Sequence, residues 1–133
     1  MSEEPQASGS HLRIAYPMIF VTDMARTVAY YEGRLGFKVD YLYGDPPFYG
    51  MMTRDGASFH FRHVDKIPMV RTDTDLLATV VSAQGVRALF REFEEKGASF
   101  HQSLKIQPWG STDFIVEDPD RNLICFSSKN DQA

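Results

Sequence analysis

The chain has 133 residues, enough for one domain with a buried core that folds without a disulfide or a structural metal. Its net charge of −4, with no dense Lys/Arg run and no long apolar run, argues against a nucleic-acid partner and a transmembrane helix. The single cysteine, Cys125, cannot form an internal disulfide and fits a reducing compartment, so we expect a cytoplasmic protein.

The first half of the chain predicts a strand, a helix and three more strands after a disordered polar tail at residues 1–11. Residues 12–22 are apolar and rich in β-formers, and Pro17 is typical of an edge strand or a strand start. Asp23 or Thr22 can cap the helix that follows. Apolar residues at helical spacing and closing glycines mark that helix: Met24, Val28, Tyr31, Leu35, Gly33 and Gly36. Turn residues separate the three expected strands, at residues 37–43, 48–54 and 58–63.

The second half repeats this pattern. A strand is expected at 75–82, and an apolar stripe with a closing glycine predicts the next helix: Val86, Leu89, Phe90, Phe93 and Gly97. Strands follow at 99–107, 112–117 and 122–128. We therefore predict an α+β fold of two βαβββ modules, at 12–64 and 75–128, joined by a linker at 65–74 into a single domain at 12–128.

Three segments in this order resemble the vicinal-oxygen-chelate (VOC) superfamily, which includes glyoxalases, bleomycin resistance proteins and extradiol dioxygenases. They are VTDMARTVAYYEGRLGFKVDY at 21–41, TRDGASFHFRH at 53–63 and PWGSTDFIVEDPDRNLICF at 108–126. The resemblance extends from about Leu12 to Ser128. It implies that each module forms a curled mixed sheet, that the paired sheets enclose a cleft and that the helices pack outside.

Side-chain alternation in the strands agrees with such a cleft, because successive residues of a strand point to opposite faces. Phe59, Phe61 and His63 would face the helix, which leaves Ser58, His60 and Arg62 toward the cleft. By the same parity Ile19, Val21, Ile124 and Phe126 would face the helices, and the cleft side would carry Tyr16, Met18, Phe20, Leu123 and Cys125.

Metal-dependent relatives imply ligand positions at Tyr16, His60, Asp75 (or Leu76) and Cys125. His60 is the routine ligand among them, because a tyrosine hydroxyl is protonated near neutral pH and a free cysteine is usually a small buried hydrophobe. A metal site of His60 with Asp75 and Cys125 is therefore the alternative, and it would support a metal-dependent lyase, isomerase or dioxygenase. No nucleophilic triad can be argued from the sequence, so no catalytic residue is assigned and the question of enzyme activity stays open.

The preferred interpretation follows the bleomycin-resistance branch, which the strand Phe59-His60-Phe61 after the turn Asp55-Gly56 resembles. The resemblance implies a metal-free homodimer, without a cofactor, that sequesters an aromatic or drug-like ligand in the manner of an antibiotic resistance protein. Flat aromatic and apolar walls with a few polar anchors suit such a ligand. The expected ligand-binding residues are Tyr16, Met18, Phe20, Phe48, His60, Arg62, Trp109, Asp113 and Cys125.

Overall fold

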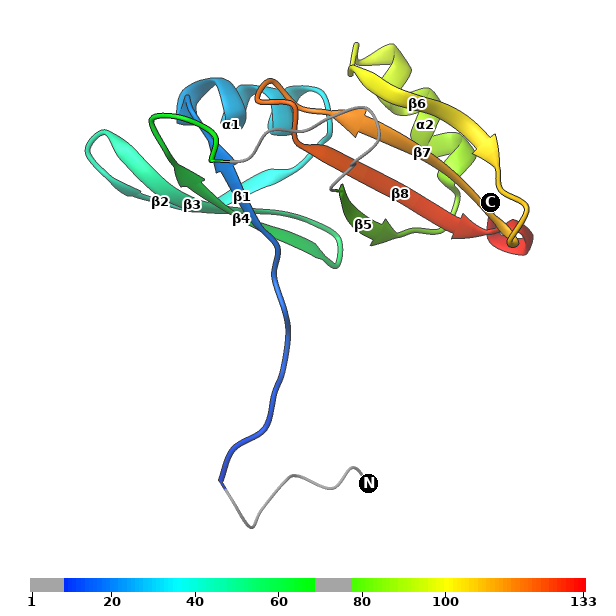
Figure 1. The fold of residues 1–133 in the computed structure, drawn as a ribbon, viewed down its shortest axis with the longest axis horizontal. Coiled ribbons are helices and arrows are strands. Elements are labelled where there is room, and N and C mark those ends of the chain that lie inside the picture. Colours follow the sequence, from blue (N-terminus) through cyan, green and yellow to red (C-terminus); the bar gives the residue numbers. More distant parts are fainter. Residues whose placement is uncertain (1–8, 69–77) are drawn as a thin grey trace.

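The computed structural model describes residues 9–68 and 78–133. The first module contains β1 (Met18–Val21), α1 (Met24–Gly33), β2 (Lys38–Gly44), β3 (Pro47–Arg54) and β4 (Ala57–His63). The second contains β5 (Ala78–Ser82), α2 (Val86–Glu95), β6 (Phe100–Ile106), β7 (Ser111–Glu117) and β8 (Leu123–Lys129), followed by a short 3₁₀ turn, η1 (Asn130–Gln132). This order confirms the predicted α+β fold of two βαβββ modules (Figure 1).

Each module forms one mixed sheet of four strands with the same topology. The strand orders are β1-β4-β3-β2 and β5-β8-β7-β6, and in both sheets the first strand runs parallel to the last strand of its module. Helix α1 packs on β2 and β3, and α2 packs on β7 and β8. One face of each sheet therefore meets a helix, and the other face is left open.

Local sequence explains where α1 begins and ends. The carboxylate of Asp23 accepts a hydrogen bond from the backbone N–H of Arg26, at 3.0 Å, and so caps the helix as predicted. Gly36, just after the helix, has a φ of +74°, a left-handed conformation that favours glycine. The chain can therefore turn sharply from α1 into β2.

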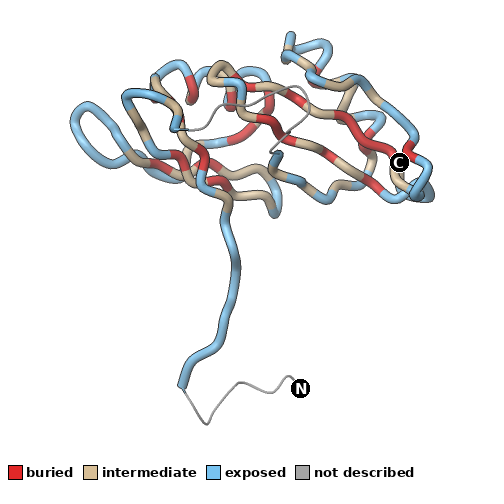
Figure 2. Tube along the Cα trace, in the orientation of Figure 1, coloured by how far each residue is buried: buried red, intermediate tan, exposed pale blue. Residues whose placement is uncertain are grey.

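The first strand is shorter than residues 12–22, which is a correction to the sequence prediction. Only Met18–Val21 pair with β4, and the hydrogen bond from the backbone N–H of His60 to the carbonyl of Pro17, at 3.0 Å, marks where the pairing begins. Residues 9–16, called the arm from here on, run away from the body and are exposed (Figures 1 and 2). The apolar pattern of the arm suits a strand, but within the described chain it has no neighbouring strand.

The helix-facing sides of the two sheets form the core, as the alternation predicted. Ile19, Val21, Phe59 and Phe61 are buried in the first module, beneath the buried ring of Tyr31. The second module buries Phe93, Phe114, Val116, Ile124 and Phe126. Edge-to-face contacts between these rings stabilise both halves.

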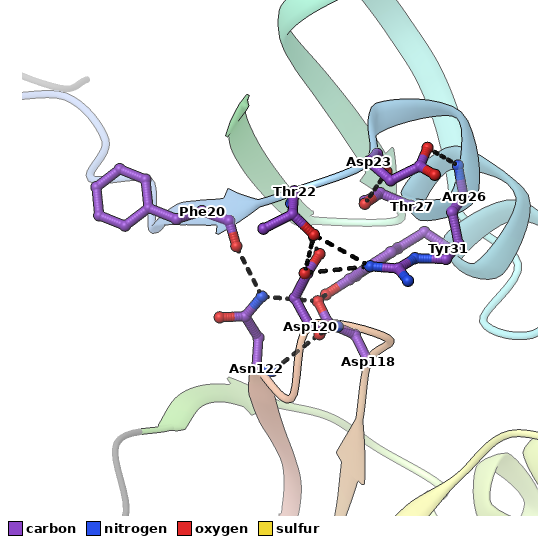
Figure 3. A network of polar contacts seen from close by, with 9 residues as sticks. All are labelled: Phe20, Thr22, Asp23, Arg26, Thr27, Tyr31, Asp118, Asp120 and Asn122. Atoms are coloured by element: carbon purple, nitrogen blue, oxygen red, sulfur yellow. Dashed lines mark hydrogen bonds and ion pairs between the residues drawn. The ribbon is translucent and has the colours of Figure 1, made fainter. Parts of the chain in front are cut away.

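Hydrogen bonds join the modules where the turn between β7 and β8 reaches β1 and α1 (Figure 3). The Tyr31 hydroxyl donates to Oδ2 of Asp118 at 2.9 Å, and Nδ2 of Asn122 donates to the carbonyl of Phe20 at 3.0 Å. The carboxylate of Asp120 accepts from the backbone N–H of Thr22 and from Arg26. These hydrogen bonds hold the β7–β8 turn of the second module against β1 and α1 of the first.

Neither α1 nor α2, the helices of the described residues, is long and apolar enough to span a membrane.

Candidate ligand-binding site

The open face of the first sheet brings together five of the residues predicted for the cleft. Met18 pairs with His60, and Phe20 pairs with Arg62, across β1 and β4. Paired residues share a face of the sheet, and their neighbours Ile19 and Phe61 are buried on the opposite face. The ring of Tyr16 lies against the imidazole of His60, so the fifth residue joins the same surface.

Four rings form a continuous row across this face, named here the aromatic row: Tyr16, His60, Tyr49 and Tyr41. The ring centroids are 4.7 Å apart between Tyr16 and His60, 5.7 Å between His60 and Tyr49, and 6.3 Å between Tyr49 and Tyr41. These spacings are those of interacting aromatic rings. Neighbouring ring planes are inclined by 31° to 66°, and Tyr16 and Tyr41 are both more than 40% exposed, so the row presents aromatic rings to solvent at both ends.

Tyr41 and Tyr49 are absent from the sequence-based list of site residues. The alternation of β3 contains a signal for Tyr49, because Met52 is buried and residues 49, 51 and 53 therefore share the open face. No such signal exists for Tyr41. A register shift between Val39 and Tyr41 in the pairing of β2 with β3 changes the parity of β2, and alternation alone cannot reveal it.

The polar centre of the row is His60. Its Nδ1 lies in hydrogen-bond contact with the hydroxyl of Tyr49. Its Nε2 is buried and, among the described residues, has no hydrogen-bond partner. A buried ring nitrogen without a partner is costly, so it marks a place where a ligand atom would be favourable.

Arg62 is the second polar group on this face. It is exposed, and it lies two residues beyond His60 on the same strand. In the described part of the chain its guanidinium forms no ion pair. The face therefore combines aromatic rings with the positive charge of Arg62.

Asp113 and Cys125 belong to the second sheet. The buried carboxylate of Asp113 accepts hydrogen bonds from Nε2 of Gln102 at 2.9 Å and from Nε2 of Gln107 at 3.0 Å. The pKa of the Cys125 thiol is raised to about 11 by burial and, secondarily, by the negative charge of Asp113. Asp113 thus holds the β6–β7 hairpin together, and Cys125 is protonated at neutral pH.

Phe48 and Trp109 are not members of the row. Phe48 follows the β2–β3 turn and packs on Tyr43, with ring centroids 5.5 Å apart. Trp109 is 74% exposed in the β6–β7 turn, and the two turns lie at opposite ends of the body (Figure 1). A single chain therefore does not bring all nine predicted residues into one site.

An open groove of about 1060 Å³ separates the two modules. It lies between the start of β4 on one side and β5 with α2 on the other, and its walls include Phe59, Val80 and Leu89. None of the nine predicted residues lines it. This groove and the aromatic row are therefore two different surfaces.

Comparison with protein families identifies the fold. Residues 13–126 match the model of the Glyoxalase/Bleomycin resistance protein/Dioxygenase superfamily. The chain belongs to this superfamily. The match spans both modules and confirms the resemblance seen in the sequence.

Solved structures of the superfamily share the architecture at low sequence identity. The bleomycin resistance determinant encoded on transposon Tn5 is 19% identical, with 90% of this chain and 99% of that chain covered and a TM-score of 0.75. TioX from Micromonospora sp. ML1 is 20% identical, with 90% and 95% covered and a TM-score of 0.68. A glyoxalase/bleomycin resistance protein/dioxygenase from Alicyclobacillus acidocaldarius is 17% identical, with 89% and 92% covered and a TM-score of 0.74. A comparison with curated protein sequences found no match.

The described donors do not fit the metal site that some superfamily members imply. Residues 9–68 and 78–133 contain no group of three or more His, Cys, Asp or Glu side chains placed to hold an ion. His60 and Cys125 lie on different sheets, and a thiol with a pKa of about 11 is a poor ligand at neutral pH. Asp75 and Leu76, the remaining positions, lie outside the described residues.

Proposed function

We propose that this superfamily member binds a small planar aromatic compound against the aromatic row, without a metal ion or other cofactor and without turnover. The observation that carries the proposal is the row itself: four rings lie across an open sheet face, and at their centre is Nε2 of His60, which has no hydrogen-bond partner among the described residues. Aromatic walls with one or two polar anchors suit a planar ligand. Met18 and Phe20 extend the apolar wall along β1.

We further propose that the chain works as a homodimer, in which a second copy covers the open face. Apolar side chains that a monomer would normally bury are exposed on both sheets, among them Met18 at 46% and Val80 at 68%. Leu12 and Ile14 of the arm are exposed as well. Exposed apolar surface of this extent is typical of an interface. A partner's second sheet would add Cys125 and Trp109 to the cleft.

Sequestration of a drug-like compound in the cytoplasm is the biological role that we propose. One structural neighbour is named as a bleomycin resistance determinant, and the present chain shares its fold. The protonated, half-buried thiol of Cys125 suits a reducing compartment.

Binding of planar aromatic probes tests this proposal directly. A panel that includes 2-naphthoate is titrated by calorimetry, with quenching of the single tryptophan, Trp109, as a second readout. We expect His60→Ala to weaken binding about tenfold with little change in melting temperature, because the Nε2 anchor is lost. Gln84→Ala, on the wall of the groove, serves as the matched control.

Two outcomes contradict the proposal. Loss of binding in Gln84→Ala but not in His60→Ala would show that the ligand binds in the groove and not against the aromatic row. A large fall in stability of His60→Ala with unchanged affinity would assign His60 to the core.

Metal content discriminates this proposal from the metal-dependent lyase, isomerase or dioxygenase that His60 with Asp75 or Cys125 would support. Protein purified without chelator is analysed for metals before and after incubation with zinc, nickel, manganese and ferrous iron. We expect no stoichiometric ion. A stoichiometric ion that disappears in His60→Ala would overturn the proposal and direct the work to enzyme assays.

A further inference from the structure

The contact between Tyr49 and His60 determines which nitrogen of the imidazole can meet a ligand. Tyr49 reaches Nδ1 from β3, whose residue Met51 pairs with His60. A neutral imidazole has one nitrogen that carries a proton and one that accepts a hydrogen bond. The direction of the hydrogen bond between Tyr49 and Nδ1 therefore decides whether Nε2 carries the proton and donates, or lacks it and accepts.

The chemistry of the two groups indicates that direction. The hydroxyl of Tyr49 lies in hydrogen-bond contact with Nδ1 of His60. A phenol O–H is a good donor and its oxygen a weaker acceptor, whereas the unprotonated nitrogen of a neutral imidazole is a good acceptor. The favoured arrangement is therefore donation from the Tyr49 hydroxyl to an unprotonated Nδ1.

We propose that Tyr49 positions His60 as the Nε2–H tautomer, so that the site selects aromatic ligands that present a hydrogen-bond acceptor, a carbonyl or carboxylate oxygen, to Nε2. The ligand selection rests on the proposed function, whereas the tautomer does not. Tyr49 acts through His60 and is a positioning residue.

The surroundings of Nε2 support an acceptor rather than a donor on the ligand. Nε2 is buried and unpartnered among the described residues, so an incoming oxygen would satisfy it. Arg62 lies on the same face of β4, about 7 Å further along the strand. Its positive charge also favours an electron-rich group on the ligand. Tyr16, whose ring lies against the imidazole, is the residue of the exposed arm nearest to β1.

Nitrogen NMR of histidine-labelled protein tests the tautomer without any ligand. Spectra are recorded where the imidazoles are neutral, and His60→Gln assigns the resonances among the four histidines. We expect unprotonated Nδ1 and protonated Nε2 in the wild type, and a mixture of tautomers in Tyr49→Phe. Tyr43→Phe, on the same sheet but without contact to His60, should leave the spectrum unchanged.

A wild-type spectrum with protonated Nδ1 would overturn the proposal, and so would an unchanged tautomer in a folded Tyr49→Phe variant. The wild-type spectrum decides alone if that variant does not fold.

A pair of matched probes tests the ligand selection. We expect 2-naphthoate to bind about 3- to 10-fold more tightly than 2-methylnaphthalene, which lacks the acceptor. That preference should shrink in Tyr49→Phe and persist in Tyr43→Phe. Equal affinity for both probes in the wild type would overturn the selection. The expected tautomer without binding of either probe would confirm the role of Tyr49, and it would overturn the proposed function together with the selection.

Discussion

Arg54 and Glu92 form the ion pair that joins β3 to α2 across the two modules. Nη1 and Nη2 of Arg54 donate to the two carboxylate oxygens of Glu92 at 2.7 Å and 3.0 Å, and Nη1 also donates to the carbonyl of Leu35. The hydrogen bond from Arg54 is the main reason that the pKa of Glu92 falls from 4.5 to about 2. This bidentate pair is partly shielded from water, so it contributes more than an exposed one.

Glu92→Gln should therefore lower the free energy of unfolding by about 1–2 kcal/mol at neutral pH, after allowance for solvent screening. A lowered folded-state pKa stabilises the protein above the unfolded value of 4.5, and that stability is lost as the pH falls toward about 2. Urea denaturation of wild type and variant between pH 7 and pH 2 should show a difference that is constant at neutral pH and disappears near pH 2. Glu94→Gln, an exposed change on the same helix, is the control. A difference that persists unchanged to pH 2 would contradict this account.

Residues that share the face of the candidate site could be predicted from the sequence where strand parity is regular. Met18, Phe20, His60 and Arg62 lie on one open face, as alternation indicated. Tyr41 could not be predicted, because the register shift in β2 is a property of its pairing with β3. The hydrogen bonds that Gln102 and Gln107 donate to the Asp113 carboxylate could not be predicted either, because they form only in the folded β6–β7 hairpin.

At the scale of elements, the turn between β7 and β8 holds the two modules together through Asp118. Its Oδ1 accepts the backbone N–H groups of Asp120 and Asn122, and its Oδ2 accepts the Tyr31 hydroxyl and Nδ2 of Asn122. Both oxygens are thus occupied by donors in a buried position. The turn Asp118-Pro119-Asp120, part of a segment that resembles the superfamily in sequence, therefore stabilises the contact between the two modules.

Asp118→Asn should lower the free energy of unfolding by about 1–3 kcal/mol, because an amide NH₂ would face donors in place of one carboxylate oxygen. Denaturant titration measures the change. Asp131→Asn, an exposed change in η1, is expected to have no measurable effect. Equal stability of the two variants would show that the hydrogen bonds of Asp118 contribute little to the free energy of unfolding.

At the scale of the whole molecule, the exposed arm and the open sheet faces predict self-association. Sedimentation equilibrium of the full chain should give the mass of a dimer. Removal of residues 1–14 deletes the exposed side chains of Leu12 and Ile14, and we expect it to raise the dimer dissociation constant at least about tenfold. A wild-type chain that sediments as a monomer at every concentration would contradict the dimer and require another cover for the aromatic row.

The sequence by itself determined the two modules, the order of their strands and helices and the residues that face the core. Those features depend on local spacing, since hydrophobic periodicity and turn residues act within a few positions of the chain. Local sequence did not determine that β1 begins only at Met18. A strand needs a neighbouring strand, and β4 offers none before Pro17. Only the tertiary structure decided that Tyr49 would meet His60, that Phe48 and Trp109 would lie apart and that Asp118 would bind Tyr31. Each of these depends on contacts between strands, turns and helices that are brought together by folding, which no local pattern encodes.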